Sequence, residues 1–493
     1  MTQPPDLILR GGRVVDPESG FDAVADVAVA GDRILAIGNA LPPAPAELDA
    51  TGHVVTAGFI DLHSHVNGIA GLRLQALDGV TTALELEAGV TPVGAAYRQA
   101  GAEGRPVNFG FATSWALARM EAVAGVRLDG RLDTFLANIA GTAWQQQASP
   151  AQVTSMLGRL DDDLADGALG IGILVGYAPG TEPDEYLRVA ALAAAAGVPT
   201  FTHARDMIEM VPGAAIDGAE EIVRAAGETG ARMHYCHLNS TSQRYVDRVL
   251  GLVGRAQRAG SHVTTEAYPY GSGMTGIGAA FLAPERLGER GLTPQSLTYA
   301  PTGEQVASAE RLRELRATDP GGLVVIRLLD EDDPADRELL MRSLTFPGAI
   351  VASDAMPLTW SGRAPDPRSW PLRADAVTHP RTAGTFSRAL RLLAGSQGPL
   401  GLTETLRRCS LLPACLLQDR VPAMRGKGRL QPGSDADIVV LDPAAVSDQA
   451  TYTASTRPSS GIRHVLVNGT PVVRDSHLVA DALPGRPVRA QPR

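Results

Sequence analysis

The chain has 493 residues, of which 44% are hydrophobic, so it can bury a large core and still accommodate a second domain. Its formal net charge of −10 argues against nucleic acid or an anionic membrane surface as partner, because both favour basic patches. No apolar run approaches the roughly 20 residues that span a bilayer, and the first residues show no signal-peptide pattern. Three cysteines are too few for a disulfide framework, so we expect a cytoplasmic protein.

Taken in chain order, short apolar segments alternate with segments of helical spacing, as in an α/β fold. A (β/α)₈ TIM barrel requires eight parallel strands, and the sequence offers eight candidates. A long stretch, 271–347, separates the last two, and we expect it to lie over the barrel mouth as a lid or as a passive excursion. The predicted strands are 58–65, 80–87, 106–114, 168–175, 198–203, 231–237, 262–270 and 348–354.

The first of these strands, GFIDLHSH at 58–65, carries the most informative motif. Alternate residues of a strand share a face, so His63 and His65 can hold one metal ion with two neutral imidazoles. Asp61 has the same parity and could accept the second ring N–H of an imidazole. The motif ends its strand at the C-terminal end, where such barrels carry their chemistry.

With this HxH pair the chain resembles the metal-dependent amidohydrolase superfamily. The strings THARD, YCHLNSTS, EAYPYGSGMT, VASDAMPL and HPRTAGTFSR resemble its N-acyl-D-amino acid deacylase branch, which includes the D-aminoacylases. The resemblance implies a small β-sandwich built from both ends of the chain. We therefore predict three parts: 1–57 and 423–493 as the sandwich halves, and 58–422 as the barrel.

The resemblance also implies further metal ligands at strand ends. His203 closes the fifth predicted strand, His237 the sixth and Asp354 the eighth. His234 is an odd number of residues from His237, so we expect its side chain to face the other way. The same argument turns Cys236 away from His237 and makes it a small buried hydrophobe.

The anion that would bridge two metal ions is not the usual one. Many relatives use a carbamylated lysine on the fourth strand, but Lys427 is the only lysine in the chain. The deacylase branch uses a cysteine after the second strand, where this chain has Glu85 and Glu87. Buried carboxylates are costly unless they are paired or metal-bound, so we predict Glu87, or failing it Glu85, as the bridge. One or two Zn²⁺ ions are expected, with Mn²⁺ or Fe²⁺ as alternatives at this harder, oxygen-rich site.

The chemistry expected of these parts is hydrolysis of a linear amide. A metal-activated water would attack the carbonyl, and Asp354 would take the proton and pass it to the leaving nitrogen. Tyr268 or Tyr270 could stabilise the oxyanion. Arg381 or Arg205 could pair with the substrate carboxylate, because the branch's lysine after the sixth-strand histidine is here Asn239, which cannot supply the charge. Asn239 itself remains a candidate for binding the substrate. His379 opens the branch-specific HPRTAGTFSR string and joins the substrate-binding candidates.

We therefore predict a metal-dependent amidohydrolase that acts on small N-acyl-D-amino acids, with no nucleic-acid or membrane partner. A homo-oligomer is compatible with the sequence. The first alternative is a cyclic-amide hydrolase of the hydantoinase or dihydroorotase kind, and the second is an inactive scaffold that kept the fold. Intact His63, His65, His203, His237 and Asp354 argue against the scaffold.

Overall fold

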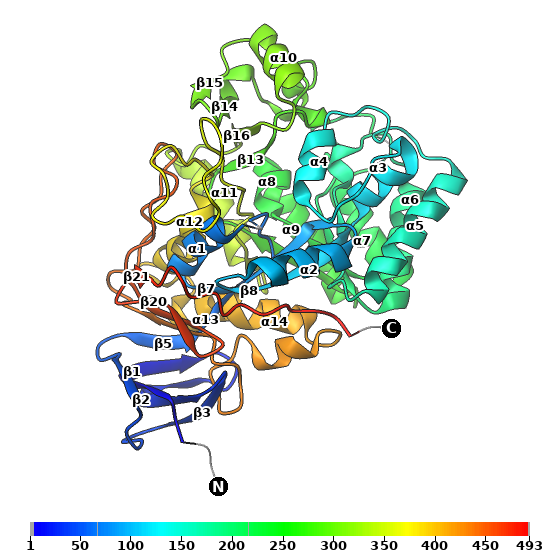
Figure 1. Ribbon diagram of the computed structural model, residues 1–493. Helices are drawn as coiled ribbons and strands as arrows, with labels where there is room; N and C mark the ends of the chain where they lie inside the picture. Colours follow the sequence, from blue (N-terminus) through cyan, green and yellow to red (C-terminus); the bar gives the residue numbers. More distant parts are fainter. Residues whose placement is uncertain (1–3, 67, 215, 492–493) are drawn as a thin grey trace.

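The structure is a computed structural model that describes residues 4–66, 68–214 and 216–491. It contains an eight-stranded, a nine-stranded and a four-stranded sheet. Figure 1 shows the nine-stranded sheet packed beside the barrel and the four-stranded sheet at the opposite end of the molecule. In the described part of the chain, every helix is too short or too polar to cross a bilayer.

The eight-stranded sheet is the barrel that the sequence predicts. Its strands are parallel and follow one another in chain order, with β17 next to β12 at the end of the series. A parallel bridge between Ser64 and Ala355 joins the two edges. The strands are β6 (Phe59–Asp61), β7 (Val80–Val90), β8 (Asn108–Ser114), β9 (Ile171–Ile173), β10 (Pro199–Thr202), β11 (Arg232–Tyr235), β12 (Val263–Ala267) and β17 (Ile350–Val351).

These strands are buried on both faces, and all 11 residues of β7 are buried. The sequences of such strands are nearly continuous apolar runs, because helices cover the outer face of the sheet. The barrel interior holds a layer of large apolar side chains, among them Leu84, Leu86 and Phe201. Polar side chains lie above this layer, toward the C-terminal ends of the strands.

The helices around the barrel begin and end at recognisable signals. In α5, Ser149 and Gln152 form a capping box and Pro150 takes the first helical position. The helices of the barrel are α1 (Ile69–Leu77), α2 (Val93–Glu103), α3 (Trp115–Ala124), α4 (Leu132–Asn138), α5 (Pro150–Ala165), α6 (Pro183–Ala196), α7 (Gly218–Thr229), α8 (Leu238–Ser242), α9 (Val246–Arg258), α11 (Pro334–Thr345), α12 (Arg381–Ala389), α13 (Gly401–Leu406) and α14 (Leu412–Leu417).

The nine-stranded sheet combines both ends of the chain, as predicted. Strand β5 pairs with β1 on one side and with β18 on the other, so the N-terminal and C-terminal strands form one continuous sheet. Its strands are β1 (Leu7–Asp16), β2 (Phe21–Ala30), β3 (Arg33–Gly38), β4 (Ala46–Asp49), β5 (Val54–Ala57), β18 (Ile438–Leu441), β19 (Ile462–Val467), β20 (Thr470–Arg474) and β21 (His477–Leu478).

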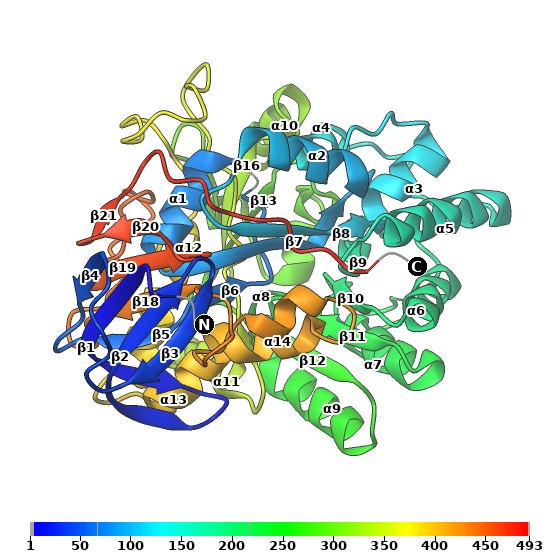
Figure 2. The same cartoon turned by 60° about the horizontal axis from the view of Figure 1, so that its bottom comes forward.

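The last residues leave this sheet and close the floor of the barrel. Val488 N donates to the Phe109 carbonyl, and Ala490 N donates to the Gly167 carbonyl. Both acceptors lie at or before the start of a barrel strand, so the tail covers the N-terminal ends of the strands. Figure 2 shows this red segment running past β8 toward β9.

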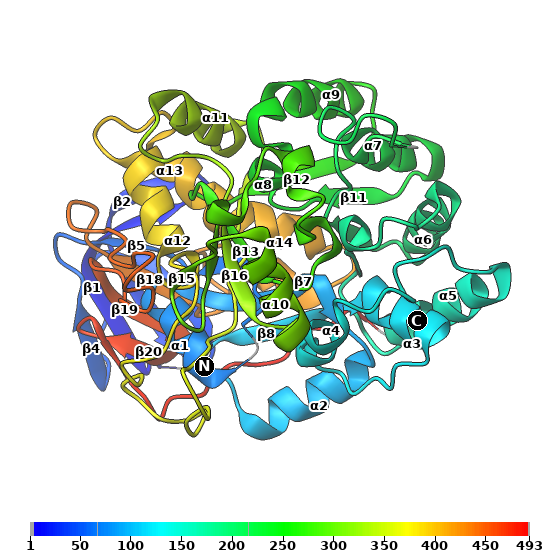
Figure 3. The same ribbon diagram turned by 90° about the horizontal axis from the view of Figure 1, so that it is seen from above.

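The insertion between β12 and β17 forms the four-stranded sheet. The local strand predicted within GGLVVIRLL is β16 (Leu323–Arg327), which pairs with β13 (Ser272–Gly276) and β14 (Leu297–Tyr299). Strand β15 (Glu304–Gln305) and helix α10 (Ala309–Thr318) complete it. In the view from above, Figure 3 shows β13, β16 and α10 in front of the barrel. The insertion therefore covers the end of the barrel that carries the site described next.

Candidate metal centre

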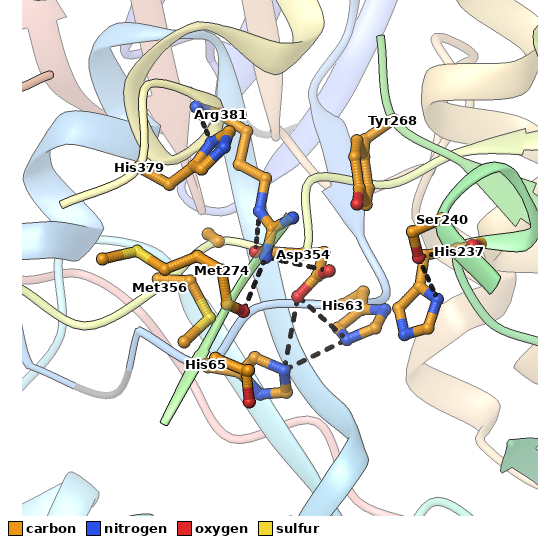
Figure 4. A network of polar contacts seen from close by, with 12 residues as sticks. His63, His65, His237, Ser240, Tyr268, Met274, Asp354, Met356, His379 and Arg381 are labelled. Carbon is orange, nitrogen blue, oxygen red and sulfur yellow. Dashed lines mark hydrogen bonds and ion pairs between the residues drawn. The ribbon is translucent and has the colours of Figure 1, made fainter. Parts of the chain in front are cut away.

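The HxH pair lies directly after β6 with both side chains buried. Nε2 of His63 is 3.1 Å from Nε2 of His65, so the two rings point at the same place (Figure 4). Ring planes at 85° to each other keep the two imidazoles from stacking. The His63 and His65 side chains thus point in the same direction, as their spacing predicts.

Glu87 lies among four histidines. Its Oε1 is 2.5 Å from Nε2 of His237 and 3.1 Å from Nδ1 of His203. Its Oε2 is 3.1 Å from Nε2 of His63 and 3.4 Å from Nε2 of His65. A carboxylate that reaches one histidine pair with each oxygen has the position of a bridging ligand.

His203 and His237 follow β10 and β11 at the same end of the barrel. The backbone of His237 has φ of 30°, in the left-handed region that residues other than glycine seldom adopt. Ser240 fixes the ring, because its hydroxyl lies 2.9 Å from Nδ1 of His237. This local strain turns the His237 side chain toward Glu87, which regular strand alternation would not do.

Asp354 follows β17 and also has a left-handed backbone, with φ of 51°. Its Oδ1 is 3.5 Å from Nε2 of both His63 and His65. Its Oδ2 is 2.9 Å from Nη2 of Arg381. Figure 4 shows His65 on one side of Asp354 and Arg381 on the other. The carboxylate therefore joins the histidine cluster to a buried guanidinium.

The charges at this centre suit a divalent cation. Burial by itself would raise the pKa of Glu87, but His63 and His237 outweigh it and hold that pKa well below its usual range. Burial likewise opposes the charged form of His63, yet Glu87, Asp354 and Glu266 raise its pKa well above the usual value. Several buried carboxylates thus lie close together and need a nearby positive charge. A metal ion supplies that charge while the imidazoles stay neutral.

The ligand atoms are also close enough for a metal ion. Those of His63, Glu87 and His237 lie within 4.8 Å of one another, and so do those of His63, His65 and Asp354. Imidazole nitrogen and carboxylate oxygen are the ligands that catalytic zinc sites use. The donor set therefore fits one or two divalent ions.

Two further carboxylates hold the histidine rings from behind. Glu85 lies 2.9 Å from Nδ1 of His65, so its carboxylate does not point at the centre. The sequence named Glu85 as the second candidate for the bridging anion, and the structure does not place it there. Glu266, which the sequence analysis missed, is 2.5 Å from Nδ1 of His63. Such contacts fix the tautomer and orientation of a metal-binding imidazole. The missed signal was a carboxylate in a barrel strand, the same signal that singled out Glu85 and Glu87.

The spacing of His234 from His237 predicted that its side chain faces away from the site, but the structure places it on the site side. Its Nε2 is 3.1 Å from Oε2 of Glu266, inside the barrel, and its Nδ1 is 2.8 Å from the Thr264 hydroxyl. Cys236 is likewise buried inside the barrel, close to His63 and Glu266. The prediction was wrong because the turn at His237 breaks the strand alternation from which it was counted.

Asp61 does not bind an imidazole ring, contrary to expectation. It accepts hydrogen bonds from the backbone N–H of His63 at 3.2 Å and of Ser353 at 2.9 Å. Gln75 donates to its other oxygen at 2.6 Å. Asp61 thus ties the first barrel strand to the last one and positions the backbone that carries His63.

Two of the predicted substrate-binding residues lie elsewhere. Arg205 forms a two-pronged ion pair with Glu221 on α7, at 2.7 and 3.0 Å, and this pair draws the guanidinium away from the centre. The Asn239 amide is occupied by the backbone of Tyr268 and Tyr270, with contacts of 3.3 and 3.4 Å. Asn239 therefore holds the turn after β12 and does not replace the branch's lysine.

Tyr270 and His379 lie behind Arg381, away from the metal centre. Their rings pack edge to face with centroids 5.7 Å apart, and Nδ1 of His379 accepts from Arg381 N at 3.1 Å. Tyr268, in contrast, lines the cavity above the centre. The Arg381 guanidinium carbon is 4.6 Å from the centroid of the Tyr268 ring.

The cavity above the centre, called the reaction cavity from here on, has a volume of about 80 Å³. The insertion supplies part of its wall through Met274, Phe281 and Arg290. Arg290 was not predicted; its guanidinium lies 4.1 Å from the Phe281 centroid and pairs with Asp206. The wall is otherwise mainly apolar, with Leu132, Phe135, Leu174, Tyr177, Ile326, Leu328 and Met356.

Known proteins with similar sequences cover nearly the whole chain. An N-acyl-D-glutamate deacylase of Alcaligenes xylosoxydans xylosoxydans is 28% identical over 491 residues, which span 95% of this chain and 93% of that relative. A D-aminoacylase of the same organism is 28% identical over 500 residues and covers 96% and 95%. A dihydroorotase of Geobacter metallireducens matches 55% of this chain at 24% identity. The predicted resemblance to the deacylase branch is confirmed.

A solved structure agrees with these relatives. The N-acyl-D-glutamate deacylase of Bordetella bronchiseptica, complexed with zinc and a phosphonate inhibitor, has a TM-score of 0.75 and 25% identity, covering 99% of this chain and 100% of that one. The model of the amidohydrolase family matches residues 46–473. This match runs from the N-terminal part of the composite sheet through the metal centre to β20, and the chain therefore belongs to the amidohydrolase family.

Proposed function

We propose that this protein is a metal-dependent hydrolase that cleaves the amide bond of N-acyl-D-amino acids. The observation that carries the proposal is the position of Glu87 among four histidines, with Asp354 between that cluster and Arg381. The deacylases that resemble the chain over most of its length support the substrate class. Free Cys236, Cys409 and Cys415 support a reducing, cytoplasmic location.

His63, His65, His203, His237, Glu87 and Asp354 would hold one or two Zn²⁺ ions, or Mn²⁺ or Fe²⁺ in their place. A divalent ion there polarises a carbonyl group and lowers the pKa of water toward neutrality. Glu85 and Glu266 keep the His65 and His63 rings in place through their Nδ1 atoms.

Asp354 is the proton carrier in this proposal. Its Oδ1 faces the histidine cluster and would accept the proton of a water molecule activated there. Arg381 lowers the pKa of Asp354 against the effect of burial, so the carboxylate is ionised and ready to accept. The same oxygen then returns the proton to the leaving nitrogen, without which the amine cannot depart.

Arg381 and Tyr268 provide the anchor for the carboxylate of the D-amino acid. Both Nη1 of Arg381 and the Tyr268 hydroxyl are buried and have no hydrogen-bond partner among the described residues. Buried donors without partners are costly, and a bound anion satisfies them. A carboxylate here would sit beside Asp354 on the side away from His65, which leaves the scissile amide over the histidine cluster.

The test is a turnover screen of the purified protein with added Zn²⁺ or Mn²⁺. Substrates are N-acetyl derivatives of D- and L-amino acids, together with dihydroorotate and hydantoin for the cyclic-amide alternative. We expect hydrolysis of D-derivatives, loss of activity with a chelator and recovery with metal. Turnover of the cyclic amides alone would contradict the proposal, and a metal-loaded protein without any turnover would favour the inactive scaffold.

A further inference from the structure

A second and larger cavity adjoins the reaction cavity. It has a volume of about 380 Å³, within the usual range of small-molecule sites, and it lies between α1, α2 and the segment 357–373. The two cavities share His65, Leu132 and Pro357 as wall residues. The histidine cluster thus forms part of the boundary of a space that the proposed chemistry has not used. We call it the side cavity.

The wall of the side cavity is mainly apolar. Ala96 and Ala100 on α2, Phe111 on β8 and Leu358 contribute to it, and Trp360 adds an indole. Nε1 of Trp360 is buried without a hydrogen-bond partner among the described residues. Small alanine side chains and broad aromatic ones leave room for a flexible apolar group, which gains from leaving water.

The arginines that line the side cavity are already paired, Arg373 through Asp375. Arg105 lies 2.9 Å from Glu103, and Arg131 lies 3.2 Å from Asp133. Arg131, Asp133 and Glu103 are exposed and form the outer rim. Among the described wall residues, the cavity therefore has no unpaired guanidinium for an anionic group, in contrast to Arg381 on the other side of the centre.

The side cavity and Arg381 lie on opposite sides of Asp354, and this arrangement decides which part of a substrate the side cavity can bind. Oδ2 of Asp354 faces Arg381, whereas Oδ1 faces His65, which borders the side cavity. In the proposed function, the leaving D-amino acid lies toward Arg381 and Tyr268. The acyl group, on the other side of the scissile carbonyl, then extends past His65.

We infer that the side cavity holds the acyl chain, and that the preferred substrates carry an apolar acyl group longer than acetyl, such as hexanoyl, octanoyl or phenylacetyl. This inference rests on the proposed function and adds its acyl specificity. Hydrolysis would release the matching carboxylic acid into the cavity and the free D-amino acid toward Arg381. Each added methylene that the cavity buries should raise kcat/KM about fourfold until the space is filled.

The test measures kcat/KM for N-acetyl, N-hexanoyl, N-octanoyl and N-phenylacetyl derivatives of one D-amino acid. Ala100→Phe should fill the side cavity and cut activity on the long acyl groups at least about tenfold while sparing N-acetyl. Ala102→Phe makes the same change on the exposed face of α2 and should leave the whole series unchanged. Equal losses for acetyl and octanoyl substrates in Ala100→Phe would overturn the inference and make the cavity an entry route.

Trp360→Ala gives an independent check, because it widens the same cavity and should move the optimum to a longer chain. Inhibition by the product acid gives another: octanoate should inhibit the wild-type enzyme at least about tenfold more tightly than acetate, and Ala100→Phe should remove that difference. Hydrolysis of N-acetyl-D-amino acids with no gain from longer chains would overturn the acyl assignment alone. An enzyme that cleaves none of the acyl series would overturn the proposed function with it.

Discussion

At the scale of single residues, the two candidate glutamates have different surroundings although both lie on β7. Glu87 contacts all four histidines, whereas Glu85 contacts His65 from behind. In the proposed metal centre, Glu87 would bind metal and Glu85, two residues earlier on β7, would orient a histidine that binds metal. The pairing of β7 with β8 shifts register between Glu85 and Val90, so regular strand alternation does not relate the two side chains.

Glu87→Gln should therefore weaken metal binding, because a neutral amide is a poor bridging anion. We expect the purified variant to hold less metal by elemental analysis and to lose activity in proportion. Wild-type activity should survive reconstitution in bicarbonate-free buffer, since a carboxylate bridge needs no CO₂. Glu221→Gln, a buried glutamate paired with Arg205 outside the site, is the control and should keep its metal. Full metal content in Glu87→Gln would refute the bridge.

Asp354→Asn tests the proton carrier separately from the metal. The amide keeps the size of the side chain and its contact with Arg381 but cannot accept a proton. We expect kcat to fall about 10² to 10⁴-fold, the usual range for a lost general acid–base, while most of the metal remains. Near wild-type turnover across the pH range would show that another group carries the proton.

At the scale of secondary-structure elements, Glu266 joins three barrel strands. It contacts His63 beyond β6 and His234 on β11, and its Oε1 also accepts from the backbone N–H of His237 at 3.2 Å. Two histidines from distant parts of the chain, both proposed to bind metal, thus contact one side chain on β12. The element that carries Glu266 provides no ligand itself.

Glu266→Gln should loosen this arrangement without changing its volume. We expect weaker binding of Co²⁺, read from its visible absorption spectrum, by about 10 to 100-fold, as for other residues that support metal-binding histidines. A residue with a purely structural role would lower the thermal midpoint without changing the cobalt spectrum. An unaltered spectrum and affinity would therefore contradict the positioning role.

At the scale of the whole molecule, the two ends of the chain support the barrel from outside. The N-terminal and C-terminal strands share one sheet, and the tail after it covers the barrel floor. Val488 is 1% exposed and packs with the apolar layer inside the barrel. The floor of the barrel thus depends on residues far from it in sequence.

Val488→Ala should lower the free energy of unfolding by about 2 kcal/mol, for the apolar surface lost and the cavity left. The shift in a urea unfolding curve measures it. Val479→Ala removes the same atoms from a side chain that is 38% exposed and should change the curve little. Identical curves for the two variants would mean that the tail does not support the barrel.

The sequence by itself determined the barrel, the composite sheet and the residues His63, His65, His203, His237 and Asp354. The barrel strands and the HxH pair follow from local patterns: apolar segments of strand length, and polar residues at strand ends, where parallel strands meet at one face. The composite sheet and the roles expected of His203, His237 and Asp354 followed from the resemblance to the deacylase branch. The contacts of Glu266, Arg205 and Asn239, and the cavity wall supplied by Arg290, were decided only by the tertiary structure. Glu266 and His63 are 203 residues apart, and a left-handed turn at His237 changes the direction of its own side chain relative to His234 and Cys236. Such contacts depend on packing between distant elements, which no local pattern encodes.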